Sequence, residues 1–162
     1  IVGGDDLGVV KSGEMIRYGE VKINAETCTL CLSCVGACNV SALVADKKTN
    51  SILFNPSVCT ACGYCELSCA EKNTISLEVG KLVLKPESFV YSELAHDELF
   101  ACVECGKEFA TKKAVEKIAA IMQPRFGNDR AKIKALYCCA DCKAKIMVQA
   151  QLNAMREDLL NG

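Results

Sequence analysis

Cysteines dominate the chemistry that this sequence can perform. CTLCLSCVGAC at residues 28–38 places four thiols close together, and CTACGYCELSC at residues 59–69 repeats the spacing at a constant offset of 31 positions. Two cysteines with two residues between them rarely reach disulfide geometry while holding a regular fold. Such thiols suit a metal ion or cluster, and the odd total of 13 cysteines agrees with this interpretation. The repeat indicates a duplicated half-domain with a pseudo-twofold axis.

The composition is that of an ordinary soluble protein. Apolar residues make up 51% of the 162 residues and charged residues 24%. We see neither an apolar run of about eighteen residues, as a membrane span requires, nor the basic start of a secretory signal. Reduced thiols and these absences predict a cytoplasmic location. The formal net charge of −1 makes nucleic acid an unexpected partner.

Alternating polar and apolar residues predict short strands around the cysteine motifs. The candidate strands are residues 20–23, 42–45, 51–54, 75–79 and 81–84. A polar turn at residues 46–50 predicts a hairpin between two of them, and Gly80 predicts a second hairpin in the same way. Short helices are expected at residues 33–37 and 63–68, between the third and fourth thiols of each motif.

Beyond Pro86 the apolar period changes to that of helices. Thr111 is predicted to cap a helix that stops at Pro124, and Asp129 to cap a second one. A last helix is expected at residues 143–160. The residues predicted to face inward on these three helices are Ala114, Val115, Ile118, Ile121 and Met122, then Ile133 and Leu136, then Ile146, Met147, Ala150 and Met155.

The double C-x2-C-x2-C-x3-C motif resembles that of the bacterial two-cluster ferredoxins, over residues 21–84. The resemblance implies a ferredoxin-like βαβ–βαβ domain with two [4Fe–4S] clusters. In that family three thiolates of one motif and the fourth of the other hold each cluster. Carried over, the first cluster would be held by Cys28, Cys31, Cys34 and Cys69. The second would be held by Cys59, Cys62, Cys65 and Cys38.

One feature departs from the family pattern. Members usually have proline after the fourth cysteine, whereas Asn39 and Ala70 stand there in this chain. Proline would fix φ and remove an N–H donor, so its absence affects the turn geometry and the reduction potentials rather than the ligation. Clusters that only hold the fold together, and zinc bound by the same thiols, are the alternatives to electron transfer.

Four cysteines of the second half predict another metal site. Cys102 and Cys105 resemble a zinc knuckle, while Cys139 and Cys142 open the last helix, as in zinc-ribbon and treble-clef modules. Four thiolates can close a tetrahedral structural zinc site without catalytic activity. Cys138 is one thiol too many and a possible substitute for a neighbour. A third iron–sulfur cluster and a redox dithiol pair remain as alternatives.

We therefore expect an α+β fold in three parts. These are an N-terminal extension at residues 1–20, a two-cluster ferredoxin domain at residues 21–86, and a mainly α-helical domain with a zinc-ribbon-like site at residues 87–162. His96, the single histidine, is expected to be a surface or capping residue on a helix. The basic residues Lys107, Lys112, Lys113, Lys117, Arg125, Arg130, Lys132 and Lys134 indicate a solvated face, or a docking surface for an acidic redox partner.

The predicted function is electron transfer, as a carrier or as a module of a larger oxidoreductase with redox proteins as partners. No catalytic constellation and no small-molecule substrate are predicted from the sequence. The alternative is a redox-sensing module that uses its zinc-ribbon-like half to bind protein or nucleic acid.

Overall fold

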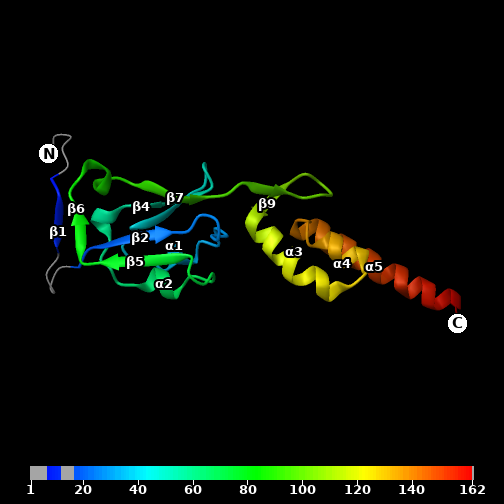
Figure 1. Ribbon diagram of the computed structural model, residues 1–162. Helices are drawn as coiled ribbons and strands as arrows, with labels where there is room; N and C mark the ends of the chain where they lie inside the picture. The colour runs from blue at the N-terminus through cyan, green and yellow to red at the C-terminus, as the bar shows by residue number, and fades with distance from the viewer. Residues whose placement is uncertain (1–6, 12–16, 162) are drawn as a thin grey trace. The chain divides into compact units, whose positions relative to one another are not determined.

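The computed structural model describes residues 7–11 and 17–161 and shows a mixture of helices and sheets (Figure 1). Much of the predicted N-terminal extension, residues 1–6 and 12–16, lies outside the described residues. The chain divides into two compact units, the first reaching Asp97 and the second starting at Glu98. Residues 87–97, which follow Pro86, belong to the first unit, because β7 (Ser92–His96) pairs with β4 (Ser51–Phe54).

In the first unit the element order β–α–β occurs twice. The first run is β2 (Gly19–Ile23), α1 (Ser33–Gly36) and β3 (Leu43–Asp46), and the second is β4, α2 (Tyr64–Leu67) and β5 (Ile75–Val79). β3 and β4 form the antiparallel hairpin that the sequence predicts. β2 pairs with β5, also antiparallel, so that each run supplies a strand to the other (Figure 1).

The predicted hairpin at Gly80 is wrong. β5 pairs along its whole length with β2, and β6 (Lys81–Val83) pairs instead with β1 (Val9–Lys11). Gly80 has φ of 100°, and its N–H donates to the carbonyl of Tyr18 at 3.0 Å. The left-handed conformation, which glycine adopts without a steric cost, turns the chain out of one ladder and into the other.

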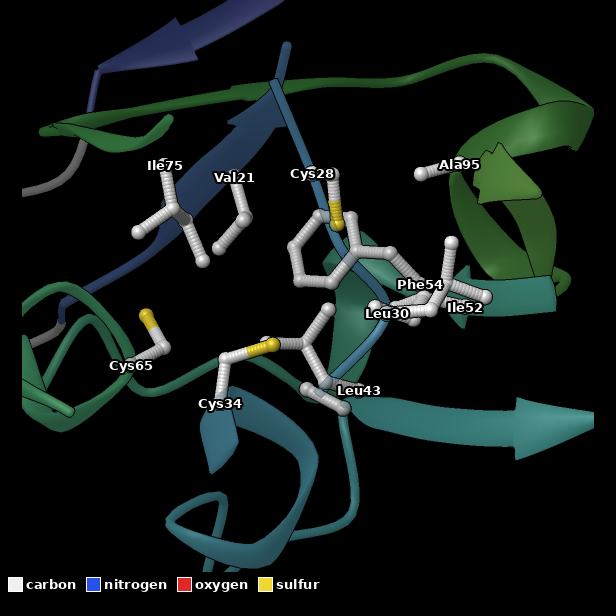
Figure 2. Packing of buried hydrophobic residues seen from close by; sticks show 11 residues of the cluster. Val21, Cys28, Leu30, Cys34, Leu43, Ile52, Phe54, Cys65, Ile75 and Ala95 are labelled. Carbon is white, nitrogen blue, oxygen red and sulfur yellow. The ribbon is translucent and has the colours of Figure 1, made fainter. Parts of the chain in front are cut away.

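The core of the first unit lies between its strands and its two short helices. Leu43, Ile52, Phe54 and Ala95 each keep 2% or less of their surface exposed. Figure 2 shows cysteine side chains, Cys34 among them, in the same cluster as these apolar groups. Full burial of a large apolar side chain contributes roughly 1.5–3 kcal/mol, so this core stabilises the unit and also surrounds the thiols.

The second unit combines a hairpin with three helices. β8 (Leu99–Ala101) pairs with β9 (Glu108–Thr111), and both lie in a segment for which the sequence predicted no strands. The helices are α3 (Lys112–Phe126), α4 (Arg130–Ala135) and α5 (Ala140–Asn161). The predicted cap of α4 is confirmed, because the carboxylate of Asp129 accepts the N–H of Lys132 at 3.1 Å. Two short 3-10 turns, η1 (Pro56–Val58) and η2 (Pro86–Phe89), belong to the first unit.

Three predictions of helix position are wrong. α3 continues through Pro124 to Phe126, although Pro124 has no N–H to donate to the carbonyl of Ala120, four residues earlier. α5 begins at Ala140, earlier than residue 143. His96 lies on strand β7, with its Nδ1 2.8 Å from a carboxylate oxygen of Glu93, and not on a helix.

The predicted apolar helix faces are only partly buried. On α3, Val115 is 3% exposed, whereas Ile118 and Ile121 are 54% and 51% exposed. On α5, Met147 and Met155 are exposed as well. A 3.6-residue period therefore gave the helices but overstated how much of each face is covered. Among the described residues, no helix combines the length and the apolar character needed to cross a bilayer.

Candidate functional site

Two small pockets in the first unit are each lined by four cysteines. Pocket A is lined by Cys28, Cys31, Cys34 and Cys69, among other residues. Pocket B is lined by Cys38, Cys59, Cys62 and Cys65. Each pocket thus collects three cysteines from one motif and the last cysteine from the other. The exchange accompanies the fold, since each short helix carries the third thiol of its motif and ends before the fourth.

The electrostatics of pocket A show how closely its thiols gather. Burial raises the pKa of the Cys34 thiol to about 11. Negative charge on Cys28, Cys31 and Cys69 is a smaller cause of the same increase in pKa. Cys69 therefore acts on Cys34 across 35 positions of sequence. A metal centre in this pocket has to displace the proton of Cys34, because the thiolate is the form that binds metal.

Pocket B has the same character. Burial raises the pKa of the Cys65 thiol to about 11. Burial also raises the pKa of Cys59; the N–H of Ala61 opposes this change, and negative charge on Cys38 and Cys62 adds to it. Cys38 thus lies beside a thiol of the second motif, although it belongs to the first.

The loops that carry the first three thiols of each motif repeat one backbone geometry. Leu30 and Leu32 have φ of 48° and 61°, and Ala61 and Gly63, at the same offset of 31, have φ of 50° and 81°. Left-handed residues between right-handed or extended ones direct N–H groups into a common concavity, a nest that favours anions. The N–H of Ala61 already lies 3.4 Å from Sγ of Cys59. Both loops are therefore shaped to hydrogen-bond sulfur that carries negative charge.

A third group of thiols lies in the second unit, and we call it the C-terminal thiol group. Its Sγ atoms, from Cys102, Cys105, Cys139 and Cys142, all lie within 4.8 Å of one another. Sγ of Cys105 is 3.7 Å from Sγ of Cys139. Gly106, at φ of 72°, closes the turn between β8 and β9 and donates its N–H to the carbonyl of Cys102 at 2.8 Å.

The four thiols of this group differ in acidity. Burial raises the pKa of Cys102, but N–H groups of Cys139, Cys105 and Glu104 outweigh it and bring the pKa down to about 6. The hydrogen bond between Cys142 and Cys105 is the main cause that raises the pKa of Cys142, to about 12. One thiol of the group is therefore ionised at neutral pH while another holds its proton.

Cys138 is not one of the four thiols of the C-terminal thiol group, but it lies beside them, since burial and then the charge of Cys102 raise the pKa of its thiol. Its side chain is only 1% exposed, and its thiol donates to the carbonyl of Lys134 at 3.3 Å. Sequence reasoning also did not single out the polar residues that line pocket A, Thr29, Glu71 and Thr74. Glu71 stands two residues after the last cysteine of the second motif, a position that could have drawn attention.

Comparisons with known proteins agree with the thiol pockets. Residues 20–70 match the family model of the 4Fe-4S dicluster domain. This part of the chain is accordingly an iron–sulfur domain of ferredoxin type.

The chain is also similar to parts of longer proteins. The hydrogenase-2 operon protein HybA of Escherichia coli O157:H7 is 39% identical over 64 residues, which are 38% of this chain and 19% of HybA. HybA of Shigella flexneri gives the same values. The polyferredoxin-like subunit of an aliphatic sulfonate oxidoreductase from Pyrococcus furiosus is 42% identical over 48 residues, 28% of each chain. The chain thus spans less than a third of the length of these relatives.

Proposed function

We propose that this chain transfers electrons through two [4Fe–4S] clusters, one bound in pocket A and one in pocket B. The observation that carries the proposal is the composition of the two pockets, in which three thiols of one motif meet the fourth of the other. This is the ligand exchange that the two-cluster ferredoxin pattern implies. The element order and the exchanged strand pairing agree with a pseudo-twofold βαβ–βαβ domain.

The residues around each pocket fit such a group. Four thiols match the ligand demand of one cubane cluster, and the nests offer N–H donors to its sulfur atoms. Apolar side chains, including Phe54 and Leu77 at pocket B, exclude water from the thiols. When bound, a [4Fe–4S] cluster supplies one-electron chemistry at a potential set by burial, hydrogen bonds and nearby charge.

Each pocket has one thiol at the protein surface. Cys31 at pocket A and Cys62 at pocket B are exposed, whereas Cys28, Cys34 and Cys65 are buried. We infer that electrons enter and leave beside the exposed thiols, since a partner approaches most closely there. The buried thiols face the common core, where the two pockets share the packing around Ile52 and Phe54.

The partners that we propose are redox proteins within a larger oxidoreductase. The names of the relatives refer to a hydrogenase operon and to a sulfonate oxidoreductase subunit. A role as an electron-transfer module fits the size of the matched segment, which is a small part of each relative.

For the C-terminal thiol group we propose a structural zinc site. A tetrahedron with Zn–S bonds of about 2.3 Å has sulfur–sulfur edges of about 3.8 Å. The 3.7 Å separation of the Cys105 and Cys139 sulfurs is close to this edge. A cubane cluster is larger than a single ion and keeps its ligands farther apart. The spacing therefore favours zinc over a third cluster, and the four thiols leave no open position for catalysis.

Paired cysteine variants test the exchange of ligands. If it is correct, Cys28→Ala/Cys69→Ala removes two ligands from pocket A alone, and about four of about eight irons remain. Cys59→Ala/Cys69→Ala removes one ligand from each pocket and damages both. Ligation within single motifs would reverse the two outcomes. The measurements are iron and zinc analysis after anaerobic purification and EPR of the reduced protein, and a folded protein without iron would refute the proposal.

A further inference from the structure

The two pockets match in their cysteines but differ in the next residue that lines them. The residue two positions after the fourth cysteine of a motif is Val40 in the first motif and Glu71 in the second. Val40 lines pocket B, and Glu71 lines pocket A. Both side chains are half-buried. The duplicated frame therefore places an apolar residue at one pocket and an acidic residue at the other.

Contacts with the cysteine loops hold Glu71 beside pocket A. The hydroxyl of Thr29, the residue after Cys28, donates to Oε1 of Glu71 at 3.4 Å. Sγ of Cys69 lies 3.3 Å from the carbonyl oxygen of Glu71. The residue equivalent to Thr29 is Thr60, which lines pocket B. The threonine is thus repeated in both pockets, whereas the carboxylate is not.

We propose that Glu71 sets the cluster site of pocket A at a lower reduction potential than that of pocket B. The inference rests on the proposed function, because it requires a cluster in each pocket. Reduction adds negative charge, and a half-buried carboxylate at the pocket wall repels it more strongly than an exposed group does. In the half-reduced protein the electron then resides mainly at pocket B.

Another carboxylate, that of Glu66, should lower the potential of the site in pocket B, but by less. Negative charge on Glu66 contributes to raising the pKa of Cys65 in pocket B, after burial and the charge of Cys59. Glu66 is exposed and does not line pocket B, and its Oε1 accepts the N–H of Leu77 at 2.8 Å. Solvent screens an exposed charge more than a half-buried one. The contrast between Glu71 and Val40 therefore determines the order of the two sites.

The loops of the two motifs supply similar N–H donors, and other backbone donors reach both pockets. The N–H groups of Gly19 and Leu43 reach Cys59 and Cys38 of pocket B, and that of Ala70 reaches Cys31 of pocket A. The left-handed residues of the two loops occur in pairs at one offset, so the nests offer similar donors to both pockets. The potential of such a cluster depends on net charge, hydrogen bonds to sulfur and exposure. Backbone donors serve both pockets, and each pocket has one exposed and one or more buried thiols, so the half-buried carboxylate of Glu71 is the main difference in charge.

Exchange of the two residues provides the test. The reduction of anaerobically prepared protein is followed by EPR in a potentiometric titration, for wild type, Glu71→Val, Val40→Glu and the double exchange. We expect Glu71→Val to raise the lower midpoint potential by about 59 mV. For a one-electron step this shift changes the ratio of reduced to oxidised cluster by on the order of tenfold. Val40→Glu should lower the higher midpoint. The double exchange should keep two separate midpoints.

A conservative variant and the iron content make the outcome decisive. Glu71→Gln keeps an acceptor for Thr29 and removes only the charge. It should therefore raise the lower midpoint potential, as Glu71→Val does. Glu66→Gln should shift the other midpoint by less. Unchanged midpoints in both Glu71 variants, with about eight irons retained, would overturn the inference alone. Wild-type protein without two clusters would instead overturn the proposed function.

Discussion

Gly19 and Ala61 lie in direct contact, where the start of β2 meets the loop of the second cysteine motif. A Cβ atom at Gly19 would lie 3.0 Å from Cβ of Ala61 and 2.6 Å from Cδ1 of Leu77. The N–H of Gly19 also hydrogen-bonds Cys59 and lowers the pKa of that thiol, against the larger effect of burial. The absence of a side chain at this position therefore lets a strand approach the thiol pocket.

Gly19→Ala should destabilise the protein by about 1–3 kcal/mol, the usual effect of added volume in a packed site. The matched control is Gly36→Ala on α1, where an added Cβ meets nothing within 4 Å. Urea unfolding under anaerobic conditions gives both free energies of unfolding. Equal stability of the two variants would contradict the close approach.

Phe54→Ala should cost about 3–5 kcal/mol, because it opens a cavity in the core that surrounds the thiols. Phe54 is 2% exposed and also lines pocket B. Phe89→Ala is the control, since Phe89 is 45% exposed and its truncation should change stability much less. Thermal or urea unfolding measures the difference. The Phe54 variant should also lose iron faster in the presence of a chelator, because water reaches pocket B.

Cys139→Ser should abolish tight metal binding by the second unit, whereas Cys138→Ser should retain it. The reason is that Cys139 belongs to the C-terminal thiol group and Cys138 does not. Zinc content, and the absorption of the cobalt-substituted protein, measure the binding. Equal loss in both variants would show that Cys138 is a ligand.

Metal binding by the C-terminal thiol group should release protons at neutral pH. The pKa of Cys142 is raised to about 12, so this thiol is protonated at pH 7, while Cys102, with a pKa of about 6, is already ionised. Lowering the pH below about 6 protonates Cys102 as well and should weaken binding further. Calorimetry in buffers of different ionisation enthalpy counts the protons. Binding without proton release at pH 7 would contradict the assignment.

Asp129 should make stability depend on pH in the acidic range. Hydrogen bonds from the side chain and the N–H of Lys132 lower the pKa of Asp129 below its usual value. A depressed pKa in the folded state means that the stabilisation is present above about pH 3.9 and is lost as the pH falls through the folded value. Asp129→Asn keeps a capping oxygen but removes this dependence, and Asp129→Ala lowers the melting temperature at every pH. Melting curves between pH 2 and pH 7 compare the three proteins.

Local patterns in the sequence predicted a large part of this structure. The β3–β4 hairpin follows from alternation around a polar turn, and the cap at Asp129 from residue type alone. The pairing of β2 with β5 joins residues more than fifty positions apart, and no local pattern carries that information. For the same reason the sequence wrongly paired the strands on either side of Gly80, which are neighbours in the chain but not in a sheet.

The candidate site was predictable where cysteine spacing determined it. The cysteines of all three thiol sites were named from their spacing, whereas their grouping into pockets A and B was implied by the ferredoxin resemblance. Glu71 and Gly19 were not, because their importance depends on what folding places beside them: Thr29 for the first and Ala61 for the second. Ile118 and Ile121 were predicted to be buried because periodicity identifies an apolar face but not what covers it.

The left-handed conformations of Leu30, Leu32 and Ala61 have a consequence for the metal-free polypeptide. A residue with a Cβ atom pays roughly 1–2 kcal/mol for this conformation, a cost that contacts with bound sulfur can offset. Once an iron–sulfur cluster is lost, these loops gain the most free energy by leaving the left-handed conformation. This change would move the thiols away from their ligand positions before the β-sheets unfold. Reconstitution should therefore succeed best when iron and sulfide are supplied during refolding rather than afterwards.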